Sequence, residues 1–164
     1  MLNETINNTC FLIELCLKSI LIKHFKVEKM KVTHKYETLL NDINKNLNFN
    51  RNVFKNFGGF KILDFLKFID DKNLFVNSRY NYIIVNHDNF LILYFSLYTI
   101  YQIFYDILNL KNINDIDKIM RMYKEDSLNY TNYCEYKDYI NNIAINLPIE
   151  FEGKMDNLEN GKGS

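Results

Sequence analysis

The sequence is poor in the residues that usually interrupt a chain or cross-link it. It contains one proline, five glycines, three cysteines and no tryptophan, and Ala144 is its only alanine. Cys10, Cys16 and Cys134 form no CxxC or CxxH pair, which argues against a disulfide framework or a structural zinc site and favours reduced thiols. Because alanine is the best helix former, helices in this chain must be recognised from the spacing of apolar residues.

The common catalytic motifs are also missing. The chain has no glycine-rich phosphate loop, no GxSxG, no HExxH and no acidic calcium loop. This absence favours a binding or interaction protein over a conventional enzyme, and we expect no cofactor and no metal site. The N-terminus lacks the basic start of a signal peptide, and Glu14 and Lys18 break its apolar run. The expected location is the cytoplasm.

Net charge does not indicate a partner for the whole chain. Twenty basic and twenty acidic side chains balance, so no long-range field favours nucleic acid or a membrane surface. The distribution is uneven, because residues 18–35 hold six lysines and two histidines against Glu28, whereas acidic residues dominate 125–159. Such a basic stretch is more often a solvated helix face and loop than a binding surface.

Aromatic and aliphatic residues are abundant, with thirteen phenylalanines and twelve tyrosines. The most apolar run, residues 90–105, is shorter than the roughly 20 residues of a membrane span. We therefore expect a buried central helix over 88–109, capped by Asp88, and no membrane. Its tyrosines lie near helical spacing, which favours a core or dimer-interface role over a base-stacking platform. These tyrosines are Tyr94, Tyr98, Tyr101 and Tyr105.

Apolar spacing predicts five other helices. The first, over 5–25, has one apolar face, with the ion pair Glu14–Lys18 toward the other. Thr33 is the expected cap of the second helix, over 35–45. The others are expected over 60–69, 113–126 and 132–145, with 74–85 as a connection that is extended at 83–85. The apolar face of the first helix is assigned to Phe11, Leu12, Leu15, Ser19 and Ile22. The predicted fold class is all-α, an up-down bundle of four to six helices.

Pro148 separates two expected parts of the chain. Residues 1–147 form the predicted helical domain, and residues 148–164 form a flexible polar tail, because they contain glycine, lysine and glutamate without an apolar face.

Three segments carry a resemblance to a known family. Residues 13–21 read IELCLKSIL, residues 33–40 read THKYETLL, and Ser78-Arg79-Tyr80 follows after a long gap. In order and spacing, over about residues 5–110, they resemble the small HEPN domains (higher eukaryotes and prokaryotes nucleotide-binding). The resemblance implies a four- to five-helix bundle that forms homodimers and often acts on RNA. Many such domains are toxins, phage-defence effectors or partners of small nucleotidyltransferases.

The resemblance also implies a candidate site. Where such domains cleave RNA without a metal, an arginine binds phosphate and a nearby histidine acts as general acid or base. Here the arginine–histidine pair is Arg79 and His87, with seven residues between them, a longer spacing than the family uses. His34 is the alternative acid or base, although a histidine at a helix start more often makes a structural hydrogen bond. Arg79 can likewise hold backbone carbonyls in place of phosphate.

Two functions follow as hypotheses. The first is a HEPN-like RNA- or nucleotide-binding module of a prokaryotic toxin–antitoxin or phage-defence system, with degenerate ribonuclease residues and an antitoxin or nucleotidyltransferase as partner. Its binding residues are Lys18, His34, Lys35, Arg79 and Tyr80. The alternative is a non-catalytic helical module that binds a partner protein through its aromatic face.

Overall fold

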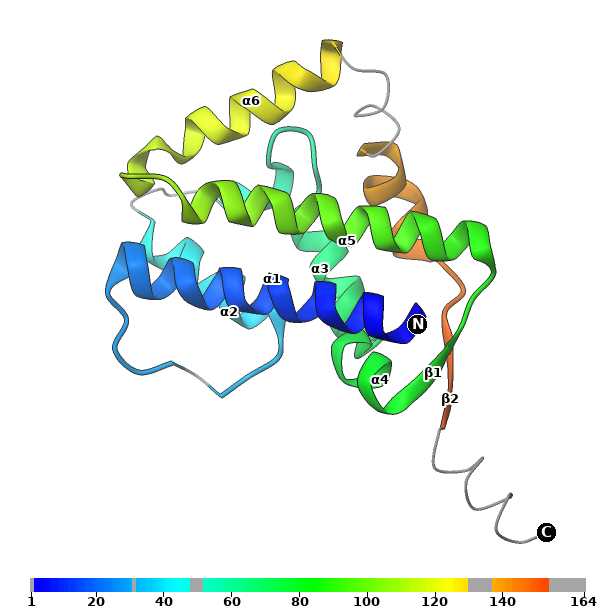
Figure 1. Ribbon diagram of the computed structural model, residues 1–164. Coiled ribbons are helices and arrows are strands. Elements are labelled where there is room, and N and C mark those ends of the chain that lie inside the picture. Colours follow the sequence, from blue (N-terminus) through cyan, green and yellow to red (C-terminus); the bar gives the residue numbers. More distant parts are fainter. Residues whose placement is uncertain (1, 31, 48–51, 130–136, 154–164) are drawn as a thin grey trace, which may run out of the picture.

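The computed structural model describes residues 2–30, 32–47, 52–129 and 137–153, and these are mostly helical (Figure 1). The all-α class is therefore confirmed, with a small two-stranded ribbon added. The α-helices are α1 (Leu2–Phe25), α2 (Tyr36–Asn46), α3 (Ile62–Asp71), α4 (Leu74–Tyr80), α5 (His87–Leu108) and α6 (Ile116–Asn129). The strands are β1 (Asn81–Ile84) and β2 (Glu150–Gly153). Short helical turns are η1 (Val53–Asn56), η2 (Ile113–Asp115), η3 (Tyr139–Ile143) and η4 (Ala144–Asn146).

Helices α1 and α5 lie side by side and run in the same direction (Figure 1). At the start of α1, the Asn3 amide donates to the Ser78 carbonyl, just before β1 leads into α5. At the other end, Lys23 Nζ and the His24 ring both donate to the carbonyl of Leu108, the last residue of α5. Polar contacts thus join the start of α1 to α4 and the end of α1 to the end of α5.

The face of α1 that packs into the core is not the predicted one. Four of the five residues expected to share the buried face, Phe11, Leu12, Leu15 and Ile22, are 40–53% exposed. The buried side is formed by Ile6, Cys10, Ile13, Leu17 and Ile20. Apolar residues surround almost the whole helix, so their spacing predicted the helix but could not determine which side packs.

The first turn of α2 is capped from another helix. Thr33, the predicted cap, accepts a hydrogen bond only from the Lys35 backbone. The Asp70 carboxylate, at the end of α3, accepts hydrogen bonds from the backbone N–H groups of Tyr36 and Glu37, at 3.0 and 2.9 Å. The expected cap was wrong because tertiary packing supplies the acceptor that a local side chain normally provides.

Replacing Asp70 with asparagine is expected to change how stability depends on pH. Burial raises the pKa of the Asp70 carboxyl above its usual 3.8, although the two N–H donors oppose this shift. The folded state therefore keeps the proton where the unfolded chain has lost it, so the contribution of Asp70 to stability falls as pH rises through this interval. The unfolding free energy of wild type minus that of Asp70→Asn should be larger at about pH 3 than at about pH 7. Urea titrations at both pH values measure this, and a pH-independent difference would contradict it.

Residues 74–85 contain a helix that the sequence did not predict. The segment that was expected to be a connection forms the short helix α4 followed by the strand β1. The predicted extended stretch is therefore present, but it begins at Asn81 rather than Ile83. Burial of Leu74, Phe75 and Ser78 along one side of α4 favours the helical form.

The predicted polar tail is partly structured. β2 pairs antiparallel with β1, with Tyr82 opposite Glu152 and Ile83 opposite Phe151. Ile149 is buried, and Phe151 packs against the core. The domain therefore extends beyond the predicted boundary at 147, because alternating apolar side chains and a free strand edge recruit this segment. Residues 154–164, the rest of the predicted tail, lie outside the described residues.

Helix α5 is the predicted central helix, with a different cap. Asn86, not Asp88, accepts the hydrogen bond from the Asn89 N–H. By length and composition α1 and α5 could each cross a membrane, but about half of each apolar window is buried in the fold. Core helices meet the same criterion, so this is weak evidence for a membrane span.

The remaining predicted helices lie close to their expected positions. The helix over 60–69 is α3, displaced by two residues at each end, and the one over 113–126 is η2 followed by α6. Of the helix over 132–145, residues 137–145 are described and are helical, and the rest lies outside the described residues.

Candidate functional site

A buried carboxylate contacts two basic side chains, one on the same helix and one from the loop that follows that helix. Glu14 of α1 is only 3% exposed. One of its oxygens accepts a hydrogen bond from Lys18 Nζ at 2.6 Å, and its two oxygens lie 3.0 and 3.1 Å from His34 Nδ1. We call Glu14, Lys18 and His34 the Glu14 cluster. The predicted pair Glu14–Lys18 is confirmed, but its acid is in the interior rather than on a solvated face.

The Glu14 contact fixes the orientation and tautomer of His34. An ionised carboxylate only accepts hydrogen bonds, so Nδ1 of His34 must carry the proton that it donates. The lone pair of the neutral ring then lies on Nε2, on the opposite side. The His34 side chain is 57% exposed while that of Glu14 is 4% exposed, so the ring projects from a buried anchor toward solvent. Carboxylate–histidine pairs of this kind orient imidazoles for acid–base or ligand-binding roles.

Phe75 of α4 supports the other side of the His34 ring. The two rings stack with centroids 5.0 Å apart and an interplanar angle of 14°. Arg79 follows Phe75 by four residues on the same helix, so the two side chains share a face, with Cβ atoms roughly 6 Å apart. Arg79 is exposed, and its guanidinium lies 5.6 Å from the ring centroid of Tyr80. Arg79 therefore lies one helical turn beyond the residue that stacks on His34.

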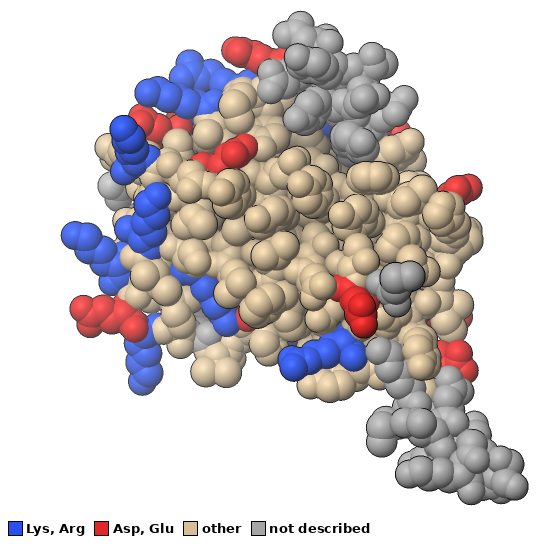
Figure 2. Space-filling view, in the orientation of Figure 1, with Lys and Arg blue, Asp and Glu red and all other residues tan. Residues whose placement is uncertain are grey.

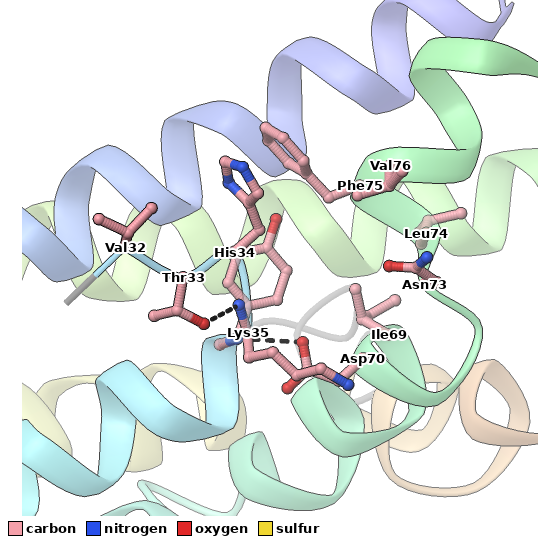
Figure 3. Close-up of a pocket in the computed structure, with 11 residues that line it drawn as sticks. Val32, Thr33, His34, Lys35, Ile69, Asp70, Asn73, Leu74, Phe75 and Val76 are labelled. Carbon is pink, nitrogen blue, oxygen red and sulfur yellow. Dashed lines mark hydrogen bonds between the residues drawn. The ribbon is translucent and has the colours of Figure 1, made fainter.

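A pocket of about 300 Å³ opens beside this cluster (Figure 3). His34 and Phe75 lie together at one side of it, and Asp70 lies at the other. Polar groups of Thr33, Lys35 and Asn73 also border the space, and its remaining walls are mainly apolar. A concave site with an apolar wall and a few polar groups is the usual form of a small-molecule site.

The residues predicted for the site fall into two groups. Lys18 and His34 belong to the Glu14 cluster, and His34 and Lys35 line the pocket, with Lys35 at the start of α2. Arg79 and Tyr80 end α4, and Tyr80 is 59% exposed.

Arg79 and His87 do not share a helix. Tyr80, the strand β1 and two further residues separate them, and His87 is the exposed first residue of α5. An extended segment of six residues spans up to about 20 Å.

The sequence did not reveal the central role of Glu14 in this site. A charged residue within a helix usually lies at the surface. The only indications of another role were its spacing to Lys18 and the position of His34 after the first helix. Phe75 was also missed, since 74–85 was expected to be a connection. Both residues act by positioning His34.

Cys10, Cys16 and the buried Tyr36 have structural rather than chemical roles. Burial raises the pKa of Cys10 to about 12 and that of Cys16 to about 11, so neither forms the thiolate that a nucleophile requires. Burial also raises the pKa of Tyr36, whose hydroxyl donates to the Cys10 carbonyl at 2.6 Å. Within the described ranges, no three His, Cys, Asp or Glu side chains gather as a metal site would require. His34 is therefore the titratable group best placed for chemistry here.

Comparison with known proteins adds no family. No protein-family model matches this chain, and neither a curated protein nor a solved structure matches it.

Proposed function

We propose that this protein is an RNA- or nucleotide-binding module of the HEPN type, acting in a prokaryotic toxin or defence system with a homodimeric organisation. The observation that supports the proposal most directly is the Glu14 cluster, in which a buried carboxylate holds Lys18 and orients an exposed histidine. All three residues of the cluster come from the segments that carry the HEPN resemblance at 13–21 and 33–40, and Arg79, outside the cluster, comes from the third segment.

The charges around the cluster favour an anionic ligand. Glu14 is paired with Lys18, while Lys35, next to His34 in the chain, and Arg79, one turn after Phe75 on α4, are exposed cations. Phosphate groups are bound by such cations, and an exposed aromatic ring such as Tyr80 can stack on a base. The pocket beside His34 offers apolar walls for a ring and polar groups for its edge.

The arrangement also favours binding over efficient cleavage. A ribonuclease of this type needs an arginine and a histidine on the same phosphate. Arg79 precedes β1 and His87 follows it within one chain, so the two residues of the sequence-predicted pair come from different helices. Any residual acid–base role falls to His34, whose Nε2 is directed away from its anchor.

Removing the His34 ring is expected to weaken ligand binding. His34→Ala should raise the Kd for a short fluorescein-labelled RNA, or for ATP, by about tenfold, the equivalent of one charge-assisted hydrogen bond. Fluorescence anisotropy and calorimetry measure these two constants. His24→Ala is the matched control, because His24 lies ten residues, or about 15 Å, further along α1 than Glu14.

The outcomes separate three cases. Loss of binding in His34→Ala and Lys18→Ala but not in His24→Ala supports the proposed site. Loss in Arg79→Ala and His87→Ala alone would move the ligand to the sequence-predicted pair. A wild-type protein that binds neither RNA nor ATP, in the presence or absence of a co-expressed partner, would overturn the proposal.

A second candidate function is a protein-interaction module. It is favoured by large apolar side chains that are exposed on α1 and α5, among them Leu15 and Tyr98 at 42% each. It predicts that substitutions at the Glu14 cluster leave the cellular effect unchanged while substitutions at Leu15 and Tyr98 abolish it.

A further inference from the structure

The neutral ring of His34 has its lone pair on the nitrogen that Glu14 does not contact. Nδ1 donates to the Glu14 carboxylate, at 3.0 and 3.1 Å from its two oxygens, so the lone pair is on Nε2. The His34 side chain is 57% exposed, whereas the carboxylate that holds it is buried. An imidazole that is anchored at one nitrogen and open at the other is a nucleophile as well as a base.

Glu14 is placed to stabilise the charge that such a nucleophile develops. When Nε2 forms a bond to an electrophile, the ring becomes positive, because Nδ1 still carries its proton. A carboxylate in hydrogen-bond contact with Nδ1 stabilises that cation. The Glu14 side chain is only 4% exposed, so water screens this attraction less than it would at the surface.

Two phenylalanine rings support the His34 ring from one side. Phe75 stacks on it with centroids 5.0 Å apart, and Phe11 of α1 lies 6.4 Å from Phe75. The face of an aromatic ring attracts a cation within about 6 Å, so Phe75 also favours the positive form of the imidazole. A ring that is held by both a hydrogen bond and a stack loses little freedom in a reaction.

The electrostatics around the ring permit an anionic reactant. Lys18 Nζ lies 2.6 Å from Glu14 Oε1, the same oxygen that lies 3.0 Å from His34 Nδ1, so a cation is held beside the imidazole. Figure 2 shows that uncharged side chains cover the centre of the surface formed by α1 and α5, with acids and cations mainly toward its edges. Among the described residues drawn there, no block of negative charge would repel a phosphate.

The pocket beside His34 has room for the rest of a phosphate donor. Its volume is about 300 Å³, and Lys35 and Thr33 border it with an ammonium and a hydroxyl group, which both donate hydrogen bonds to phosphate or carboxylate oxygens. Lys35 also interacts electrostatically with Asp70, the acid at the other side of the pocket. The pocket therefore suits the leaving group of a small activated phosphate.

We propose that Nε2 of His34 accepts a phosphoryl group from an activated phosphate, by class a nucleoside triphosphate or an acyl phosphate. The Nε2 lone pair forms the N–P bond while the P–O bond to the leaving group breaks, and its electron pair departs with the nucleoside diphosphate or the carboxylate. The ring is positive until Nδ1 passes its proton to Glu14, which returns it to water. The inference does not rest on the proposed binding of RNA or nucleotide, because an acyl phosphate requires neither.

The other two histidines are references within the same molecule. His24 is half-buried, and its Nε2 lies 3.1 Å from the carbonyl oxygen of Leu108. Because a carbonyl only accepts, that nitrogen carries the proton and is not the nucleophile. His87 is the exposed first residue of α5. It represents an ordinary exposed histidine, against which the reactivity of His34 is measured.

Phosphorylation rates of the histidines in one sample test the inference. The full chain is incubated with potassium phosphoramidate, a small reagent that phosphorylates histidine, and its peptides are quantified by mass spectrometry at alkaline pH, where phosphohistidine is stable. His34 should react about tenfold faster than His87, the equivalent of one charge-assisted hydrogen bond. Glu14→Gln should reduce this ratio to about twofold or less. Glu4→Gln, at an exposed acid of the same helix, is the matched control and should leave the ratio unchanged.

Three results would overturn the inference. One is an equal rate for His34 and His87 in the wild-type chain. Another is a full preference for His34 in Glu14→Gln that circular dichroism shows to be folded. The third is a product in which phosphorus NMR places the phosphoryl group on Nδ1. If Glu14→Gln does not fold, Glu14→Asp replaces it with the same expected loss, because it withdraws the carboxylate from Nδ1 by one methylene.

Biological classes of donor are then compared. Incubation with ATP or GTP and Mg²⁺, and separately with acetyl phosphate, should phosphorylate His34 in at least one case, and the successful donor identifies the source. Phosphorylation by none of the three would overturn the proposal even if phosphoramidate reacts. A chain that is phosphorylated at His34 by acetyl phosphate but binds neither RNA nor ATP would retain this inference and lose the proposed function.

Discussion

Replacing Phe104 with alanine is expected to lower the free energy of unfolding by about 3–5 kcal/mol. Phe104 lies on the buried side of α5 and is fully inaccessible to solvent, with its ring 5.9 Å from that of Phe54. The substitution removes an aromatic ring from the place where α5 meets the segment 53–57, and rigid helices on both sides limit how far the cavity can collapse. Urea unfolding followed by circular dichroism measures the loss.

Phe95→Ala is the control for this prediction. Phe95 is on the same helix but 40% exposed, so its removal should cost less than about 1 kcal/mol in the monomer. Both variants are compared at the same low protein concentration, so that only packing within one chain is measured. Equal losses for the two variants would show that the buried side of α5 is assigned wrongly.

Replacing Gly58 with alanine is expected to cost about 2–4 kcal/mol. Gly58 and Gly59 form the centre of a tight turn with φ values of 60° and 90°, closed by two 2.9 Å backbone hydrogen bonds between Phe57 and Phe60. A Cβ on Gly58 would lie 2.7 Å from the backbone oxygen of Met120 in α6. Positive φ and a collision with another helix's backbone therefore act together, and α6 would have to move.

Gly59→Ala separates these two causes. Its φ is also positive, but an added Cβ would meet the end of the Lys137 side chain, at 3.0 Å from Nζ, which can move aside. Only the backbone penalty of about 1–2 kcal/mol should remain. Thermal and urea unfolding of both variants measure the difference, and equal losses would show that the contact with α6 contributes nothing.

The candidate site shows which side-chain contacts can be predicted from the spacing of residues on one helix and which cannot. Spacing on one helix was enough to pair Glu14 with Lys18, because residues four apart always meet on a helix. The addition of His34 depends on where the loop after α1 returns to that helix. It also depends on α4, which supplies Phe75. The sequence did not reveal α4, because a helix of seven residues is stabilised by burial in the fold rather than by the spacing of its apolar residues.

The sequence by itself determined that the chain is helical, where most of its helices lie, and that residues near 83 are extended. Those properties depend on periodicity and backbone preference, which act over a few residues. The tertiary structure decided which side of α1 is buried, that Asp70 caps α2, that β2 joins β1, and that Glu14 is an internal anchor for His34. Each of these depends on a partner distant in the chain. For α1, whose apolar residues lie on nearly all sides, only the packing of α5, α4 and α2 against it could leave Phe11, Leu12, Leu15 and Ile22 at the surface.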